Sequence, residues 1–304
     1  MMGDAIQVSG LTYRYGRQQV LDPLTFSVPE GAVYGLLGPN GSGKSTTLRL
    51  LMGLLRRDGG VVDVLGLDPV VDPVAVKRAV GYVAESQGFY PWMRVGELLD
   101  FVGGVRPDWD PPYATHLLGA FRLTREARIR ELSKGQRAMV ALLVALAFRP
   151  RLLLLDEPTA SLDPRARGQF FESVLREYQA EGGTILISSH QIHEIAGLVD
   201  HVGILDRGRL IVSATEEALR AQVSRYTLTF ADAAPSVPID CPGVLRQVAR
   251  GRQIVLSVRR DASPDDAAEG TAVRAALDAV GALRVTVEPL GLEEIFLELT
   301  AEGG

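Results

Sequence analysis

A glycine-rich octapeptide, GPNGSGKS at residues 38–45, has the residue types needed to hold a phosphate group. It fits the pattern G-x-x-x-x-G-K-[ST], and it lies between an apolar stretch that predicts a strand and a periodic stretch that predicts a helix. Glycines let backbone N–H groups turn toward an anion, and the helix N-terminus adds partial positive charge. The expected nucleotide-binding residues are Gly38, Asn40, Gly41, Ser42, Gly43, Lys44, Ser45 and Thr46.

Two acidic residues supply what this loop lacks for catalysis. The stretch LLLLDEP at 152–158 predicts a buried strand whose end delivers Asp156 toward a metal ion and Glu157 toward an attacking water. Lys44 adds a full positive charge for the β and γ phosphates, and the Ser45 hydroxyl can bind Mg²⁺, which prefers oxygen ligands. The combination predicts metal-dependent hydrolysis of a nucleoside triphosphate.

A second anion site is predicted at residues 131–146, ELSKGQRAMVALLVAL. Ser133 can cap the apolar helix that follows and donate to a phosphate, Gly135 allows close approach, and the helix dipole favours an anion. A capped core helix alone does not explain Gly135, because glycine in a helix costs roughly 0.5–1 kcal/mol relative to alanine. One chain therefore carries two anion sites.

The elements that must position these residues are those of an α/β protein. Short strands are expected up to the phosphate loop, then a helix from 44 to 55, and then strands in GVVDVLG and VGYVAE. A helical insertion at about 87–148 contains expected helices near 94–104, 112–121 and 136–148. The apolar strands RLLLLDE and GTILISS, each followed by a helix, indicate a parallel sheet covered on both faces, and HVGILDRGRLIVSAT reads as a closing hairpin.

The sequence changes character beyond about residue 224. RYTLTFADAAPSVPIDCPG and RQIVLSVRRDASPDD look like strands with turns, GTAVRAALDAVGA looks like a helix, and LRVTVEPLG and LEEIFLELT follow. These patterns predict a small α+β domain. Its role is open between a regulatory or packing appendage and a part in handling a substrate.

Composition limits the classes of function. Of 304 residues, 46% are hydrophobic and 23% charged, which is typical of a globular protein, and the net charge of −5 argues against a general nucleic-acid binder. The one cysteine, Cys241, fits a reducing compartment. The N-terminus does not look like a signal peptide, and the longest apolar run, 138–148, is shorter than the roughly 18 residues of a membrane span. We expect any membrane role to come through a partner.

Taken together, the ordered motifs resemble those of the nucleotide-binding subunit of an ATP-binding cassette (ABC) transporter, over roughly residues 4–220. LSKGQ at 132–136 looks like the family's signature sequence, with Lys134 where glycine is commonest. The resemblance implies a P-loop ATPase core of the ABC type with an antiparallel β subdomain and the helical insertion, over residues 1–222, and leaves the α+β domain at 223–304.

The resemblance also explains the two anion sites. In this family two subunits pack head to tail, and each signature helix points at the γ-phosphate that the other subunit's phosphate loop holds. We therefore expect ATP and Mg²⁺ as ligands, Ser133, Gly135 and Gln136 as contacts to a second ATP, and a second ABC subunit that is either identical or related. No nucleic-acid partner is expected.

Other site residues are carried over from the family one at a time. Tyr15 matches the aromatic residue that stacks on adenine, and Tyr13 is the alternative because both lie on one face of a strand. His190 matches the switch histidine that contacts the γ-phosphate and helps to place the water. A metal pair of His190 with His193 is a rival interpretation that lacks a third ligand. Asp163 resembles the D-loop residue that crosses the dimer interface.

One position departs from the family pattern. The Q-loop glutamine usually ends a sequence like G-Y-x-x-Q, whereas GYVAE places Glu85 there and Gln87 two residues later. A carboxylate can still bind Mg²⁺, so we expect Glu85 to join Ser45 and Asp156 at the metal and to sense the partner. The alternative is a solvated loop residue. Glutamate at this place also occurs in cassettes of drug-resistance and antibiotic-resistance exporters, which this chain resembles most.

The expected function is that of the ATPase subunit of an exporter, bound to a membrane-spanning permease at the cytoplasmic face of the cell membrane. The aromatic residues of FYPWMRV at 89–95 are candidates for the permease contact, and the alternative is that they belong to the core of the insertion. An importer subunit, or a soluble cassette protein of translation or DNA repair, remains an alternative function. The substrate, which the membrane subunit selects, is not predicted.

Overall fold

The computed structural model describes residues 3–158, 172–235, 239, 243–260, 276 and 280–300. The chain divides into two compact units, Met1–Ser213 and Ala214–Gly304. This division lies before the expected boundary at 222/223, because α8 (Glu216–Gln222) packs against β10 (Val223–Thr229) and α10 (Leu292–Thr300) of the second unit.

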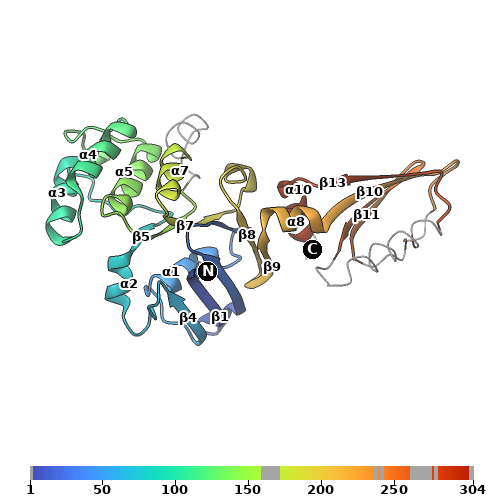
Figure 1. The fold of residues 1–304 in the computed structure, drawn as a ribbon, viewed down its shortest axis with the longest axis horizontal. Coiled ribbons are helices and arrows are strands. Elements are labelled where there is room, and N and C mark those ends of the chain that lie inside the picture. The colour runs from blue at the N-terminus through green and yellow to red at the C-terminus, as the bar shows by residue number, and fades with distance from the viewer. Residues whose placement is uncertain are drawn as a thin grey trace. The chain divides into compact units, whose positions relative to one another are not determined.

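The N-terminal unit is built on a six-stranded sheet of order β5-β6-β7-β3-β8-β9, in which the strands from β5 to β8 are paired in parallel (Figure 1). Every residue of three central strands is buried, which explains their continuous apolar sequences. The strands are β3 (Val33–Leu37), β5 (Val80–Val83), β6 (Leu152–Asp156), β7 (Thr184–Ser189), β8 (His201–Asp206) and β9 (Arg209–Thr215).

A second, antiparallel sheet of order β2-β1-β4 lies in the same unit. Its strands are β1 (Asp4–Tyr15), β2 (Gln18–Pro29) and β4 (Gly59–Val64). Buried and exposed residues alternate along β1 and β2, as expected for a sheet with one face in the core. The buried face joins one hydrophobic core with α1 (Lys44–Leu51) and the parallel sheet. The expected α/β fold, with an antiparallel subdomain, is confirmed.

The helical insertion contains the three expected helices with small shifts at their ends. They are α3 (Val95–Val105), α4 (Pro111–Ala120) and α5 (Lys134–Leu146), with the short 3₁₀ helix η1 (Ile129–Glu131) before α5. α5 packs against α3, α4 and the edge strand β5. Two more helices of this unit are α2 (Pro73–Ala79) and α7 (Glu172–Ala180).

Two expectations for this unit were wrong, and one helix was not predicted. The helix predicted from 44 to 55 ends at Leu51, because Gly53 adopts a φ of 61° that favours glycine and closes the helix. The helix expected after GTILISS is only the 3₁₀ helix η3 (Ile192–Glu194). We did not predict α2, although Asp72 caps it by accepting from the Ala75 N–H at 2.9 Å.

The C-terminal unit is a four-stranded antiparallel sheet of order β11-β12-β10-β13 with α8 and α10. The strands not yet given are β11 (Val244–Arg250), β12 (Gln253–Arg259) and β13 (Arg284–Pro289). The α+β character is as expected, but β11 and α8 were not predicted. Most of the helix expected in GTAVRAALDAVGA lies outside the described residues.

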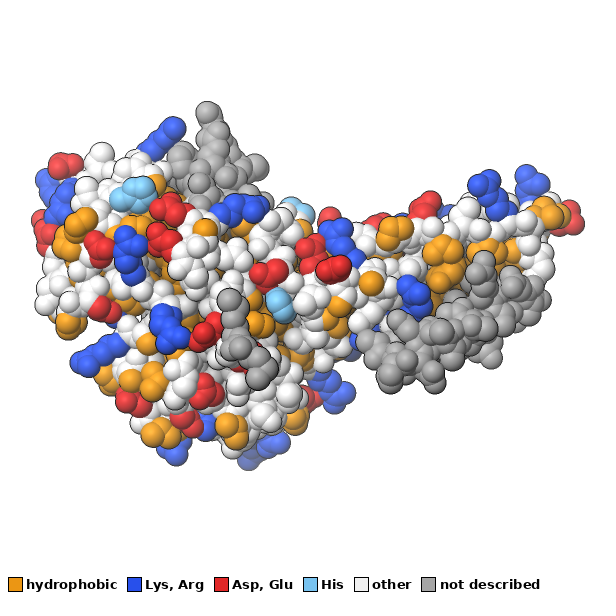
Figure 2. Space-filling model, in the orientation of Figure 1, with side chains coloured by type: hydrophobic (Ala, Val, Ile, Leu, Met, Phe, Trp, Pro, Cys, Tyr) orange, Lys and Arg blue, Asp and Glu red, His pale blue; other side chains and the backbone are white. Residues whose placement is uncertain are grey.

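The surface of the described chain carries both charges and isolated apolar side chains. Figure 2 shows basic and acidic side chains intermixed on the face of the N-terminal unit that it draws. In the described ranges, every helix is too short or too polar to span a bilayer. Exposed large apolar residues include Tyr90 and Trp92 in the N-terminal unit and Leu283 and Val287 in the C-terminal unit.

Candidate functional site

The phosphate loop leads directly into α1. Gly43 precedes the helix with a φ of 110°, and a Cβ atom there would lie 2.4 Å from Leu21, so this position requires glycine. Lys44 and Ser45 are the first two residues of the helix. The loop therefore has the strand-turn-helix setting that its sequence predicts.

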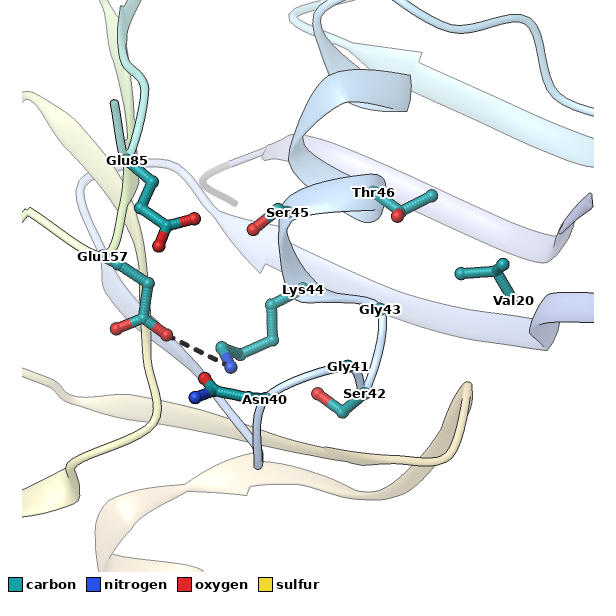
Figure 3. A pocket seen from close by; sticks show the side chains of 10 residues that line it. All are labelled: Val20, Asn40, Gly41, Ser42, Gly43, Lys44, Ser45, Thr46, Glu85 and Glu157. Carbon is teal, nitrogen blue, oxygen red and sulfur yellow. Dashed lines mark ion pairs between the residues drawn. The ribbon is translucent and has the colours of Figure 1, made fainter. Parts of the chain in front are cut away.

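A cavity of about 360 Å³ lies over this loop (Figure 3). Glu85 and Glu157 face Lys44 across it from the loops that follow β5 and β6. Nine of the ten lining residues were predicted, and Val20 of β2 was not. The lining residues are Val20, Asn40, Gly41, Ser42, Gly43, Lys44, Ser45, Thr46, Glu85 and Glu157.

Lys44 is buried and fully engaged within this cavity. Its Nζ donates to the carbonyl oxygens of Gly38 at 2.7 Å and Pro39 at 3.2 Å. It also forms an ion pair with Glu157 Oε1 at 3.2 Å, and only 5% of Lys44 and 7% of Glu157 are exposed. The ammonium group that we expect to bind phosphate thus contacts a carboxylate.

Asp156, at the end of β6, is fully buried beside α1. Its Oδ1 accepts from Ser45 Oγ and from Ser188 Oγ, both at 2.9 Å. Its Oδ2 is buried and has no hydrogen-bond partner in the described part of the chain. Burial raises the pKa of the carboxyl, and the hydrogen bonds from the two serines lower it by less. An orphaned carboxylate oxygen beside a serine hydroxyl fits a hard divalent cation such as Mg²⁺.

Ser188 is a functional residue that the sequence did not reveal. Its hydroxyl donates to Asp156 and accepts from the Glu157 N–H at 3.0 Å, so it fixes both acidic residues. The available signal was a pair of serines, Ser188 and Ser189, at the end of the strand TILISS. That signal does not say which neighbouring strand the hydroxyl contacts.

Glu157 and His190 form a coupled pair. Glu157 has a φ of 49°, which is uncommon for a residue with a side chain. Its Oε2 lies 2.8 Å from His190 Nδ1 and accepts from the His190 backbone N–H at 3.3 Å. His190 Nε2 is 3.0 Å from Gln191 Nε2. Among the described residues, no group of three His, Cys, Asp or Glu side chains is arranged to hold a metal, so the His190–His193 metal pair gains no support.

Glu85, rather than Gln87, faces the cavity. Its side chain lines the cavity opposite α1 (Figure 3). Gln87 turns toward the backbone instead, since its Nε2 donates to the carbonyl oxygens of Ala84 at 3.3 Å and Glu85 at 3.5 Å. Of these two residues, the structure thus brings Glu85 to the cavity.

The two candidate tyrosines lie in contact but differ in exposure. Their rings meet edge to face with centroids 4.9 Å apart. Tyr13 is 9% exposed and belongs to the core, whereas Tyr15 is 45% exposed. Of the two, only Tyr15 is exposed enough to contact a base, although neither lines the phosphate cavity.

The signature segment forms a capped helix start at the surface. Ser133 Oγ accepts from the Gln136 N–H at 3.1 Å, and Gln136 Oε1 accepts from the Ser133 N–H at 2.9 Å, which is a capping box. Ser133 and Gln136 are exposed, and neither they nor Gly135 line the cavity. Asp163 lies outside the described residues.

The aromatic residues after Glu85 are at the surface. Tyr90 is 58% and Trp92 66% exposed, and their ring centroids are 4.7 Å apart. The alternative that they belong to the core of the insertion is therefore wrong for these two residues. Phe89 is half-buried.

Comparisons with known proteins place the chain in a family. Residues 21–160 match the family model described as ABC transporter. The chain is 31% identical to the daunorubicin/doxorubicin resistance ATP-binding protein of Streptomyces peucetius, over 97% of this chain and 92% of the relative. It is 32% identical to the Nod factor export ATP-binding protein I of Mesorhizobium japonicum, over 97% and 86%.

The fold agrees as well. A solved structure titled as the ATP-binding subunit of an ABC transporter superposes with a TM-score of 0.66 at 28% identity, over 71% of this chain and 92% of that one. The resemblance to exporter-type cassettes that the sequence suggested is confirmed by these relatives. The chain therefore belongs to the ABC transporter family, as one of its ATP-binding, ATP-hydrolysing subunits.

Proposed function

We propose that this chain hydrolyses Mg²⁺-bound ATP between two ABC subunits and uses the resulting closure and reopening to drive a permease that exports its substrate. The observation that carries this proposal is the convergence on one cavity of Lys44, Ser45, Glu85 and Glu157, with Asp156 directly behind them. A cation, a base and metal ligands are the parts that phosphoryl transfer to water requires.

Mg²⁺ would be held by Ser45 Oγ, Asp156 and Glu85. The unpartnered Asp156 Oδ2 supports this assignment, because a buried carboxylate oxygen without a partner costs about 1–3 kcal/mol unless something binds it. When bound, the ion would neutralise charge on the β and γ phosphates. Lys44 would exchange its contact with Glu157 for one with these phosphates.

Glu157 would then accept a proton from the attacking water. Its release from Lys44 would leave Oε1 free, while His190 at 2.8 Å from Oε2 would hold the carboxylate in place and contact the γ-phosphate. Tyr15 would stack on the adenine.

The second subunit would complete the site. The start of α5, with Ser133, Gly135 and Gln136, would face the γ-phosphate bound by the other subunit, and Asp163 would cross the interface as the family's D-loop residue does. The exposed position of Ser133 and Gln136 supports this role. The second subunit is an identical or related chain.

The permease would dock beside Glu85 and the exposed Tyr90 and Trp92, and would hold the chain at the cytoplasmic face of the cell membrane. The direction of transport follows the relatives, whose names concern drug resistance and Nod factor export.

Affinity purification tests this function. Tagged Glu157→Gln would be recovered from detergent-solubilised membranes of the host with ATP and Mg²⁺, beside the matched control Glu181→Gln, an exposed glutamate outside the cavity. We expect a multi-span membrane protein with Glu157→Gln in higher yield than with the control. Recovery of ribosomes, nucleic acid or the chain alone would overturn the transport assignment.

A further inference from the structure

The C-terminal sheet has an exposed apolar edge. β13 is an edge strand in the order β11-β12-β10-β13, and its outer side has no neighbouring strand within the described residues (Figure 1). Val285 is 38% and Val287 55% exposed on this strand. Edge strands with exposed apolar side chains are templates for pairing with another strand.

These valines lie on the same face of the sheet as residues of the core. Two rows of residues cross the sheet on one face, Ile254–Leu228–Val285 and Leu256–Tyr226–Val287. Ile254, Leu228 and Leu256 are fully buried. Each row therefore runs from the core to β13, beyond which the described part of the chain adds no further strand.

The sequence of β13 is complementary to itself when it is read in opposite directions. In an antiparallel pair centred on Thr286, residues 284 and 288 lie opposite each other, as do 285 and 287. Arg284 of each copy would thus face Glu288 of the other copy, which gives two ion pairs. Val285 of each copy would face Val287 of the other. Opposite charges and β-branched residues are the cross-strand pairs that stabilise a sheet.

Both charged residues are available for such a contact. Arg284 and Glu288 are exposed, and neither forms an ion pair within the described part of the chain. Arg225, which lies opposite Glu288 on β10, instead contacts Glu294 at 2.9 Å.

We propose that the C-terminal units of two copies of this chain associate through antiparallel pairing of β13 about a two-fold axis at Thr286. The pairing joins the two sheets into one and extends both apolar rows across the axis. An interface of one short strand is small, so the pairing is weak and reversible, and covalent trapping is the measurement that detects it. The C-terminal unit thus helps to bring identical subunits together.

Disulfide cross-linking of the full chain tests this pairing. Thr286→Cys is placed in a Cys241→Ser background, which leaves one cysteine per chain. Residues directly opposite in an antiparallel pair have Cα atoms about 4.5–5.5 Å apart, which is within the range of a disulfide. The matched control is Ala249→Cys, an exposed position on the other edge strand, β11. We expect Thr286→Cys to form covalent dimer at least about ten-fold faster than the control, without nucleotide.

Charge exchange identifies the register. In the Thr286→Cys chain, Arg284→Glu or Glu288→Arg alone places like charges opposite each other and slows cross-linking about ten-fold, whereas Arg284→Lys does not. A mixture of the Arg284→Glu and Glu288→Arg chains restores both ion pairs and forms heterodimer at the original rate. Cross-linking of Thr286→Cys no faster than of Ala249→Cys, or no gain in the mixture, overturns the proposal.

Discussion

Glu157→Gln is expected to tighten nucleotide binding, because Glu157 forms an ion pair with the Lys44 ammonium group, which we expect to bind the phosphates. The Lys44 Nζ to Glu157 Oε1 distance is 3.2 Å, and both side chains are buried. At an effective dielectric constant of about 20, two unit charges at this distance attract by about 5 kcal/mol.

Only part of this attraction is expected to appear as a change in the free energy of nucleotide binding. The amide oxygen of glutamine can still accept from Lys44, and the contacts of Lys44 with the carbonyl groups of Gly38 and Pro39 remain. A net gain of about 1–3 kcal/mol corresponds to roughly 5-fold to 150-fold tighter binding.

The assay is calorimetric titration with ADP and Mg²⁺. ADP lacks the γ-phosphate that a second subunit would hold, so the measured affinity does not include closure of a dimer. Glu181→Gln, which removes an exposed carboxylate outside the cavity, serves as the control with an unchanged Kd. Equal or weaker ADP binding by Glu157→Gln would refute the view that this ion pair competes with the nucleotide.

Three further changes test other parts of the structure. Because burial raises the pKa of Asp156, the folded chain binds that proton more readily than the unfolded one, and the free energy of unfolding falls as pH rises through the folded pKa. The gain in Tm of Asp156→Asn over the unmodified chain, both without nucleotide, should therefore be larger at about pH 7.5 than at about pH 4 in thermal melts. A gain that is the same at both pH values would contradict this origin. Gly183→Ala places a Cβ atom 2.4 Å from the ring of Tyr178 and should lower the free energy of unfolding by about 1–3 kcal/mol. The control Gly104→Ala, in an open position on α3, should raise the free energy of unfolding by about 0.5–1 kcal/mol. Denaturant titration compares the two variants, and equal effects would argue against the clash. Glu85→Ala should change how the rate of hydrolysis depends on the Mg²⁺ concentration, and it should reduce the stimulation of hydrolysis by the permease. A variant unaltered in both properties would show that Glu85 is only a solvated loop residue.

The geometry of the residues that we expect to contact phosphate could be predicted, because local sequence decides it. A glycine at position 43 with a positive φ, a lysine one residue later and a strand before the loop are all encoded within about ten positions. Asp156 and Glu157 were predictable for the same reason, since four leucines before them require a buried strand.

The partners of these residues were not predictable, because the order of strands in the sheet sets them. Ser188 reaches Asp156 only because β7 lies beside β6, and Val20 lines the cavity only because β2 passes the phosphate loop. Gly53, which ends α1, packs against the backbone of Pro69, a contact that no local pattern reveals. The Lys44–Glu157 ion pair likewise joins residues far apart in sequence.

The most direct test of the central claim is the mass and nucleotide content of Glu157→Gln in ATP and Mg²⁺, measured by light scattering after gel filtration. If ATP is held between a phosphate loop and the α5 start of a second subunit, the variant forms a dimer that retains two unhydrolysed ATP molecules and shows no turnover. A monomer under these conditions, or hydrolysis at the rate of the unmodified chain, would contradict the composite site and the role of Glu157.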